Sequence, residues 1–496
     1  MKPRLIPMAH CPLLAVLLWI LQVAPARAEA NNPRTDWFAK TGYGVFVHYL
    51  SDLQNTSNRL HSLGRQTSWD ACVREFDVER FADAMHDAGA GYVIFTMNQR
   101  TRFLIAPNAT FDRISGYAPG EACATRDLVL DLHAALSRRH IPLMLYTTGD
   151  GPCQDAKAAA AFQWSAPVTT NFVSRWAEVI REYAERYGDK AKGWWVDGCY
   201  RTHGNYTYDD EKLGLLARAL KAGNSRRIIA LNNGVDPYVL PYSRHEDFTC
   251  GEQEAFFDRP VSRWVLGEQW HILSFLGHPL LENPLGTGWG QPGVRYSRED
   301  LAEYISEVNH AGGVVSIDVM LFRDGGLDRS QLELLKGLRR EMEKHLKRDI
   351  IPPGNLAFRK PTRLLSLDGW QALDVNGGSG HPRFAKFGVD GRPDTYAMAG
   401  GKWPWTFEVD LLEVRSLRRV RVTFPADHFA TQLRLEVSED RKAWRIVAER
   451  DGLDGKPFAV EFVPLKTRWI RVSAVKPDAP DQLGVQMGVA ELEAYE

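Results

Sequence analysis

Short apolar segments and amphipathic segments alternate along the chain from residue 36 to about residue 348. The apolar segments have the length and composition of buried strands, at residues 43–48, 92–96, 143–147, 194–196, 228–231 and 314–320, and more weakly at 248–251 and 264–268. Between them, apolar positions recur with the period of a helix at residues 78–88, 126–139, 172–187, 211–222, 298–311 and 329–345. This alternation predicts an α/β fold, a (β/α)8 barrel of the TIM type.

A doubly wound open sheet is the alternative for the same alternation of strands and helices. However, no GxGxxG motif follows any of the predicted strands. Its absence weakens the dinucleotide-binding form of that fold, so the barrel is the preferred prediction.

The pattern changes after a break rich in proline and glycine at residues 349–356. Beyond it, short alternating strands predominate, at residues 406–409, 419–424, 432–438, 444–448, 459–462 and 469–473, with turns of Gly, Asp and Pro between them. No helical periodicity is present in this part. The pattern predicts a barrel domain at residues 29–350 and an all-β sandwich of jelly-roll type at residues 351–496.

The first 28 residues have the features of a secretory signal peptide. Lys2 and Arg4 supply positive charge, residues 13–23 are almost unbroken apolar, and residues 26–28 (Ala-Arg-Ala) fit a cleavage site with the cut after Ala28. The apolar run is too short to cross a membrane comfortably, and no second such run follows. We expect a secreted or periplasmic protein without membrane insertion.

Charge and cysteine content argue against several classes of partner. The signal peptide holds three of the 61 basic residues and no acidic one, which leaves 58 basic residues against 62 acidic ones. This weakly acidic balance argues against nucleic acid and anionic membranes. The five remaining cysteines show neither CxxC nor Cys/His ligand spacing, so structural zinc is not expected, while one or two disulfides are compatible with the compartment. No cofactor or metal is predicted, and the oligomeric state is left open.

One carboxylate stands at the end of a predicted strand. The stretch Trp194-Trp195-Val196-Asp197-Gly198 is an apolar run that ends on a lone acid, after which glycine lets the backbone turn. Aspartate is disfavoured within strands. In a barrel of parallel strands, a carboxylate at the C-terminal end of a strand faces the catalytic side. The alternative is that Asp197 caps the following loop or helix.

Five segments together resemble the barrel of glycoside hydrolase family 29, the α-L-fucosidases. They occur in the family's order at residues 36–48 (DWFAKTGYGVFVH), 81–93 (FADAMHDAGAGYV), 125–129 (TRDLV), 194–198 (WWVDG) and 247–252 (DFTCGE). The resemblance covers about residues 36–330 and implies a glycosidase that acts on O-glycosyl bonds. It implies that Asp197 is the nucleophile and that the acid/base lies in or near the last segment.

The resemblance implies retaining hydrolysis, which needs two carboxyl groups about 5–5.5 Å apart. Asp197 is the expected nucleophile, and Glu252 is the first choice for the acid/base because aromatic residues flank it and would provide the dry surroundings that a general acid needs. Glu254 is the second choice, since alternation along a strand places it on the same face as Glu252. A solvated loop carboxylate is the alternative for either glutamate.

Four ring-bearing residues are candidates for sugar contact. His48 ends the first predicted strand, where the family has a histidine that contacts a sugar hydroxyl, and a neutral imidazole can both donate and accept a hydrogen bond. Trp69, Trp195 and Trp289 are candidates for a wall facing the sugar. Ordinary core packing is the alternative for each of these rings.

The chain departs from the family after the second predicted strand. The family carries a KHHDGF-type segment there, whose two histidines hold the hydroxyls of fucose, whereas this chain has Asn98 and Gln99. Amides also donate and accept hydrogen bonds, so both are candidates for substrate binding. The nearby Arg100 or Arg102 would favour an anionic sugar. The departure bears on sugar specificity more than on glycosidase chemistry.

The C-terminal part resembles the discoidin domain, also called the coagulation factor 5/8 C-type domain. The matching segments lie at residues 355–357, 389–395, 407–411, 435–440, 469–472 and 490–493. Such sandwiches often serve as carbohydrate-binding modules on secreted glycosidases, which is the role that the resemblance implies here. A shared fold alone does not establish binding.

The predicted function is that of a secreted retaining exo-glycoside hydrolase, α-L-fucosidase-like, which releases terminal α-L-fucosyl or related residues from glycans by double displacement. Two alternatives stay open: a catalytically inactive carbohydrate-binding protein that keeps both folds, and a glycosidase of different sugar specificity. A metal-dependent barrel hydrolase is a further alternative, but the predicted strand ends lack an HxH or a clustered His/Asp set.

Overall fold

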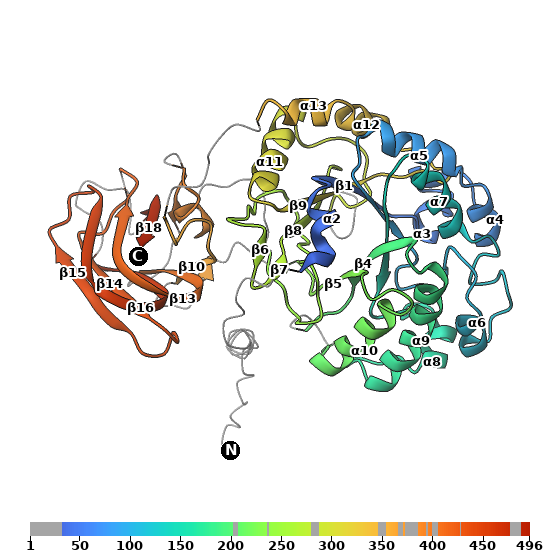
Figure 1. Cartoon of the computed structure of the whole chain (residues 1–496), viewed down its shortest axis with the longest axis horizontal. Coiled ribbons are helices and arrows are strands. Elements are labelled where there is room, and N and C mark those ends of the chain that lie inside the picture. The colour runs from blue at the N-terminus through green and yellow to red at the C-terminus, as the bar shows by residue number, and fades with distance from the viewer. Residues whose placement is uncertain are drawn as a thin grey trace, which may run out of the picture.

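The computed structural model describes residues 32–201, 207–235, 238–278, 287–345, 354–365, 371–372, 385–392, 395–398, 405–426, 428–476 and 488–496. The predicted signal peptide, residues 1–28, lies outside these ranges. A curled parallel sheet surrounded by helices comes first, and an antiparallel all-β domain follows it (Figure 1). Both parts of the predicted fold class are confirmed.

Seven parallel strands curl in the order β5-β4-β3-β2-β1-β9-β8. They are β1 (Tyr43–Val47), β2 (Val93–Thr96), β3 (Leu143–Thr148), β4 (Ala191–Asp197), β5 (Ile228–Leu231), β8 (His271–Phe275) and β9 (Val314–Val319). The strands are almost entirely buried, as expected for a parallel sheet that is covered on its outer face and filled on its inner face. Large side chains such as Phe46, Tyr92, Tyr146 and Trp195 fill the inside of the curl.

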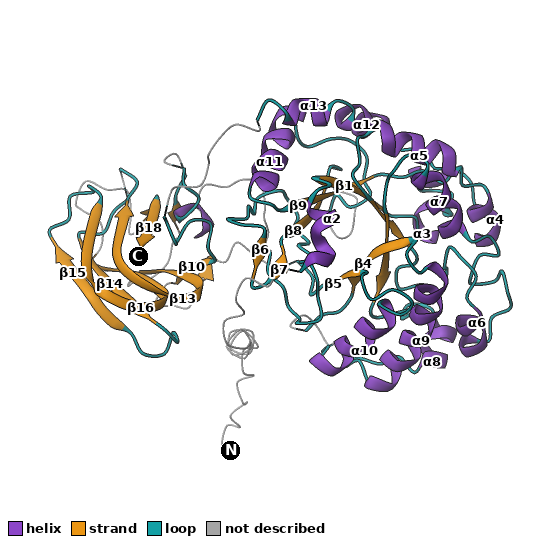
Figure 2. Cartoon of the chain, viewed as in Figure 1, coloured by secondary structure: helices purple, strands orange, loops and turns teal. Residues whose placement is uncertain are grey.

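Helices cover the outer face of the curled sheet (Figure 2). Most of them begin after an Asp, Asn, Ser or Thr whose side chain accepts a hydrogen bond from a backbone N–H of the first turn. The α-helices are α2 (Asp36–Ala39), α3 (Ser51–Gln54), α4 (Trp69–Arg74), α5 (Val78–Asp87), α6 (Ala109–Ser115), α7 (Leu128–Ser137), α8 (Ala156–Phe162), α9 (Thr170–Tyr187), α10 (Asp210–Leu220), α11 (Arg298–His310), α12 (Arg329–Leu335) and α13 (Leu338–Met342). Short 3-10 turns lie at η1 (Pro33–Thr35), η2 (Leu60–Ser62) and η3 (Ala385–Gly388).

An irregular segment, residues 247–253, takes the place of the remaining barrel strand. On one side, the Asp247 amide donates to the carbonyl of Ile229 in β5 at 2.8 Å. On the other side, Leu273 of β8 exchanges backbone hydrogen bonds with Gly251 and Gln253, at 2.9 and 3.0 Å. The segment therefore connects the two edges of the sheet, β5 and β8, and occupies the position predicted for a strand at residues 248–251.

Two side-chain hydrogen bonds and one glycine explain why this segment is not a regular strand. The Asp247 carboxylate accepts from the Ile229 amide, and the Thr249 hydroxyl accepts from the His271 amide, so side chains replace backbone groups in the ladder. Gly251 has a φ of +59°, and a Cβ added to it would lie 2.0 Å from the His271 carbonyl oxygen. Only glycine fits such a close approach of two backbones.

The strand predicted at residues 264–268 has a different form. Trp264–Val265 (β6) and Glu268–Gln269 (β7) pair as a small antiparallel hairpin, and the barrel strand β8 begins later, at His271. Leu266 and Gly267 form the turn with φ of +50° and +92°. Positive φ at both central residues matches the twist of a tight hairpin, which ends the run of alternation that predicted one strand.

The C-terminal domain is an antiparallel sandwich around its own apolar core, which includes Trp405, Phe407, Leu435 and Ile470. Its main sheet has the order β11-β10-β13-β16-β14-β15, with β18 paired to β13. The strands are β10 (Thr362–Leu365), β11 (Gln371–Ala372), β12 (Ala397–Met398), β13 (Trp405–Thr423), β14 (Gln432–Ser438), β15 (Arg445–Asp451), β16 (Phe458–Lys476), β17 (Gly488–Val489) and β18 (Glu491–Tyr495).

The sandwich touches the barrel at the loops that follow β5 and the 247–253 segment. The Tyr238 hydroxyl donates to the Thr362 carbonyl and accepts from the Thr362 amide, the latter at 2.8 Å. The Lys386 ammonium lies 4.4 Å from the centre of the Phe257 ring. Arg359, which precedes β10, also pairs with Glu307 of α11 at 3.5 Å. The described contacts therefore involve these two loops and one helix of the barrel.

The described cysteines outside the leader, Cys72, Cys123, Cys153, Cys199 and Cys250, are all free thiols. The disulfides that the sequence allowed are therefore not formed in this structure. None of the helices in the described ranges is long and apolar enough to cross a membrane.

Candidate active site

Asp197 lies at the end of β4, on the mouth formed by the carboxyl ends of the parallel strands. Side chains alternate along a strand, so Asp197 points to the same side as Trp195, whose ring lies inside the curl. The Tyr146 hydroxyl donates to Asp197 Oδ2 at 2.8 Å, and the Gly198 amide donates to Oδ1 at 2.7 Å. Gly198 has a φ of +69°, which permits this tight turn. The carboxylate is therefore oriented by donors from a rigid scaffold.

One amide nitrogen connects Asp197 to Glu252. Asn232 directly follows β5, and its Nδ2 donates to Asp197 Oδ1 at 2.9 Å and to Glu252 Oε2 at 2.6 Å. The two carboxylate oxygens cannot lie further apart than these two distances together. That upper limit coincides with the spacing of about 5–5.5 Å found in retaining glycosidases, and it is shorter than the spacing of about 6.5–9.5 Å found in inverting ones.

Two tyrosines stay protonated beside Asp197. Burial, followed by the negative charge of Asp197, raises the pKa of Tyr146 and that of Tyr200. The Tyr200 hydroxyl lies 3.5 Å from Asp197 Oδ1. Both phenols therefore keep their protons at neutral pH and act as donors toward an ionised carboxylate.

The structure separates Glu252 from Glu254. Glu252 forms an isolated parallel bridge with Leu273 of β8, whereas Glu254 follows that bridge and its backbone carbonyl accepts from Arg295. Among the residues that the structure describes, no hydrogen bond joins the Glu254 carboxylate to Asp197 or Asn232. Glu252 is the glutamate that the fold brings to Asp197.

His48 and Trp289 form another part of the mouth. His48 follows β1, its side chain is 12% exposed, and its Nδ1 lies 2.9 Å from Asp318 Oδ1. The imidazole meets the Tyr146 ring edge-on at 6.0 Å and the partly exposed Trp289 ring at 6.3 Å between centroids. Because Tyr146 also donates to Asp197, the structure brings both predicted residues into the neighbourhood of that carboxylate.

The two amides after β2 point in different directions. Gln99 Nε2 donates to the Tyr146 hydroxyl at 2.8 Å, so Gln99 reaches the mouth. Asn98 is buried and accepts from the Thr147 hydroxyl at 2.8 Å. It lines a small cavity of about 10 Å³ behind the strands, with Trp176 of α9 among its neighbours. The structure therefore does not bring Asn98 to the site, because adjacent residues of the segment face opposite sides of the sheet.

Two of the tryptophans predicted to face the sugar lie inside the protein. Trp69 is 4% exposed, and its Nε1 donates to the Leu104 carbonyl at 2.9 Å, so α4 uses this ring as core. Trp195 is 2% exposed and stacks on Tyr146, with centroids 5.5 Å apart and an interplanar angle of 13°. Trp69 is thus absent from the mouth, while Trp195 supports Tyr146 from inside the barrel.

A buried ion pair borders the mouth. Arg100 Nε lies 2.9 Å from Asp150 Oδ2, and Arg100 also donates to the Tyr200 hydroxyl at 3.3 Å. A Cβ added to Gly198 would lie 2.9 Å from Asp150 Oδ1, so Asp150 is directly behind the turn that follows Asp197. Burial raises the pKa of Asp150 to about 6; Arg100 opposes this shift and the charge of Asp197 adds to it.

Several residues that link the predicted site residues to one another were not predicted from the sequence. They are Asn232, Tyr146, Tyr200, Asp318 and Asp150. Two of them carry the signal that identified Asp197, since Asn232 follows an apolar strand and Asp318 lies near the end of another. The two tyrosines and Asp150 carry no comparable signal, because only the three-dimensional turn after β3 and β4 brings them together.

The site combines two close carboxylates with amide and phenol donors, a set suited to acid–base and nucleophilic chemistry at a glycosidic carbon. Within the ranges that the structure describes, no group of three or more His, Cys, Asp or Glu side chains could hold a metal ion.

Two family models match the chain. Residues 65–270 match the model described as α-L-fucosidase, and residues 387–472 match the model described as NedA-like, galactose-binding domain, of the F5/F8 C type. Both resemblances predicted from the sequence are confirmed. The chain thus carries a glycosidase domain of the α-L-fucosidase type and a C-terminal F5/8 C-type domain.

Similar solved structures include a family 29 fucosidase of Ruminococcus gnavus in complex with fucose, at 13% identity and a TM-score of 0.42, over 95% of this chain and 96% of that chain. A chitosan-binding module of a Paenibacillus chitosanase/glucanase, in complex with chitotriose, is 23% identical with a TM-score of 0.23, over 29% of this chain and 100% of that chain. A Clostridium perfringens module in complex with GalNAc-β-1,3-galactose is 21% identical with a TM-score of 0.21, over 23% and 84% of the two chains. No curated protein matches the chain.

The raised pKa of Asp150 predicts a pH-dependent stability. Between about pH 4 and pH 6 the folded protein holds a proton on Asp150 that the unfolded chain has lost, so stability falls as pH rises through this window. Asp150→Asn should remove this dependence. Between about pH 4 and pH 6, its free energy of unfolding should therefore rise relative to that of wild type by up to roughly 3 kcal/mol. Urea unfolding at a series of pH values measures the difference.

Asp155→Asn is a control of opposite sign, because its amide-capping and arginine-paired carboxylate has a lowered pKa. That variant should lose stability relative to wild type as pH rises toward about 4, below the window of Asp150, because the folded wild type gives up this proton before the unfolded chain does. If the free energies of unfolding of wild type and Asp150→Asn changed in parallel with pH, the raised pKa of Asp150 would be contradicted.

Proposed function

We propose that the chain is a retaining exo-glycosidase, secreted or periplasmic, which releases terminal α-L-fucosyl or closely related residues from glycans. The observation that carries the proposal is the shared amide of Asn232, which holds Asp197 and Glu252 at a spacing compatible with double displacement. The match of residues 65–270 to the α-L-fucosidase model supports the choice of sugar.

In the first step, the Asp197 carboxylate attacks the anomeric carbon while Glu252 gives its proton to the departing glycosidic oxygen. The bond from the anomeric carbon to that oxygen breaks, and an ester bond to Asp197 forms. Hydrogen bonds from Gly198 and Tyr146 keep the attacking carboxylate in place. Such preorganised donors avoid the cost of reorientation during reaction.

In the second step, Glu252 is ionised and takes a proton from a water molecule, which attacks the anomeric carbon and displaces Asp197. The sugar leaves with its original anomeric configuration, and Glu252 is again protonated for the next cycle. Asn232 suits both steps, since an amide nitrogen carries two hydrogens and can donate one to each carboxyl group. It holds their separation constant while their charges change.

The sugar would lie among His48, Gln99 and Trp289; their contacts with Tyr146, which donates to Asp197, support this part of the proposal. Gln99 is the one residue of the Asn-Gln pair that reaches the mouth. A single amide in place of two histidines favours a pattern of hydroxyl contacts different from that of typical α-L-fucosidases, so a related sugar is the second candidate substrate.

The remaining parts of the proposal concern the whole chain. We assign residues 1–28 to a signal peptide cut after Ala28, residues 29–350 to the catalytic domain and residues 351–496 to a carbohydrate-binding module. The match of residues 387–472 to a galactose-binding domain supports a glycan as the ligand of that module. Attachment of the enzyme to a glycan surface would raise the local concentration of substrate.

Turnover of an aryl α-L-fucoside tests the proposal most simply. Asp197→Ala should reduce kcat by at least about 10⁴-fold, because the covalent step loses its nucleophile. Asp52→Ala, which alters an acidic residue of the short helix α3, is the matched control and should retain activity. Absence of turnover by wild type on a broad panel of aryl glycosides, together with retained glycan binding, would favour the catalytically inactive alternative.

The two glutamates can be separated by azide rescue. Glu252→Ala should slow turnover of an aryl fucoside with a good leaving group mainly at the second step, because that leaving group departs without protonation but water lacks its base. Azide needs no base and should accelerate the variant, with formation of a glycosyl azide. Glu254→Ala should behave as wild type. If azide accelerated Glu254→Ala instead, Glu254 would be the acid/base and Glu252 would not.

A further inference from the structure

Asp318 is a buried carboxylate at the mouth with no assigned role. Its side chain is 1% exposed, and it lies near the end of β9, the strand beside β1. Oδ1 lies 2.9 Å from His48 Nδ1, and Oδ2 accepts from the Gly290 amide at 2.6 Å. One carboxylate thus contacts both the candidate histidine and the backbone beside Trp289.

We propose that Asp318 is a positioning residue, which fixes the ring orientation and the tautomer of His48 so that Nε2 faces the substrate as a hydrogen-bond acceptor. The proposal rests on the function proposed above and deepens it, because it states which chemical group the sugar must present at this point. That group is a hydroxyl acting as a donor.

The tautomer follows from the partners of the two carboxylate oxygens. An ionised carboxylate only accepts hydrogen bonds, so the contact at Nδ1 requires a hydrogen on that nitrogen. In the neutral imidazole, Nε2 then carries a lone pair and no hydrogen. Among the described residues, His48 Nε2 has no hydrogen-bond partner, and the side chain is partly exposed at the mouth. The acceptor is therefore available to a ligand.

The same carboxylate orients the aromatic wall. The Gly290 amide is held by Asp318, and the Gly290 carbonyl accepts from His61 Nε2 at 2.6 Å. Trp289 directly precedes this glycine, which is anchored on both sides, and packs edge-on against Phe275, at 4.8 Å between centroids. Asp318 thereby controls the relative placement of an imidazole and an indole, which would face one sugar ring.

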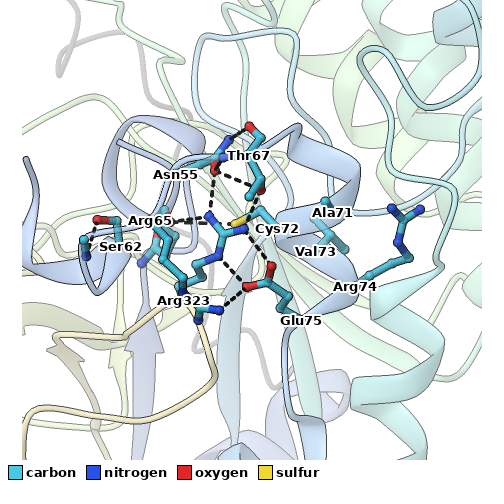
Figure 3. Close-up of polar contacts among 12 residues, drawn as sticks. Asn55, Ser62, Arg65, Thr67, Ala71, Cys72, Val73, Arg74, Glu75 and Arg323 are labelled. Atoms are coloured by element: carbon cyan, nitrogen blue, oxygen red, sulfur yellow. Dashed lines mark hydrogen bonds and ion pairs between the residues drawn. The ribbon is translucent and has the colours of Figure 1, made fainter. Parts of the chain in front are cut away.

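The loop that carries His61 is held from behind by a buried guanidinium. The Arg323 amide donates to the His61 carbonyl at 2.8 Å. Figure 3 shows its side chain among Asn55, Thr67 and Glu75; the Arg323 Nε to Glu75 Oε2 distance is 2.8 Å, and NH1 donates to Asn55 Oδ1 at 2.7 Å. A fully buried arginine with several charge-assisted bonds ties the loop after β1 to the loop after β9. The anchor of Gly290 is thus rigid.

Asp318→Asn tests the proposal with almost no change of shape. The Gly290 N–H needs an acceptor, so the new amide oxygen faces Gly290 and the new NH2 group faces His48 Nδ1. Two donors cannot face each other, and the ring must move its hydrogen to Nε2. The variant should reverse the tautomer of His48, and kcat/KM should fall about 10-fold because the sugar hydroxyl must turn from donating to accepting a hydrogen bond at Nε2.

The readout is nitrogen NMR of the full chain labelled on histidine, measured at an alkaline pH at which the His48 nitrogen shifts themselves show a neutral ring. His48→Ala identifies the resonances by their loss. We expect hydrogen on Nδ1 in wild type and on Nε2 in Asp318→Asn. Asp324→Asn, which alters a carboxylate paired with Arg80 nearer the surface, is the matched control and should leave the tautomer and kcat/KM unchanged.

The tautomer is measured without substrate, so its outcome is independent of the proposed function. Hydrogen on Nε2 in the wild-type protein would overturn the proposal even if the variant failed to fold. An unchanged tautomer in a folded Asp318→Asn variant would also overturn it. Failure of the proposed glycosidase activity would instead appear as absent turnover by wild type, with the predicted tautomers still observed.

Discussion

The hydrogen bonds from one amide nitrogen, Asn232 Nδ2, to Asp197 and Glu252 are the interaction on which the site depends. Two carboxyl groups so close would repel each other if both were ionised, and an amide between them reduces that cost while limiting their separation. Each partner comes from a different segment of the chain. The distance that decides between two classes of hydrolysis is thus set by a side chain that itself undergoes no chemical change.

The closure of the barrel makes this interaction possible. Residues 247–253 connect β5 to β8 with an irregular backbone, in which Asp247 and Thr249 supply side-chain hydrogen bonds and Gly251 allows close approach to β8. Glu252 therefore reaches Asn232 from the neighbouring position in the barrel. The remaining mouth residues come from strand ends or the loops after them, which is why residues distant in sequence meet there.

The sequence predicted the parts of the site that depend on periodicity and missed those that depend on irregular backbone. Asp197 was recognisable because it ends an apolar run, and the barrel was recognisable from alternation. Alternation could not separate Glu252 from Glu254, because the segment is not a regular strand. Asn98 and Gln99 were equivalent as sequence, yet one turns into the wall and the other into the mouth. Burial of Trp69 had no local signal either, since it depends on packing from distant segments.

The stereochemistry of hydrolysis depends on the spacing of Asp197 and Glu252 rather than on their presence, so it shows whether Asn232 holds them at the spacing of a retaining enzyme. Proton NMR of an aryl α-L-fucoside during hydrolysis records the anomeric form of the first sugar released. Carboxyl groups held within reach of one amide nitrogen predict the α anomer first, followed by slow equilibration with the β anomer. Initial release of the β anomer would require a water molecule between more distant carboxyl groups and would contradict the account.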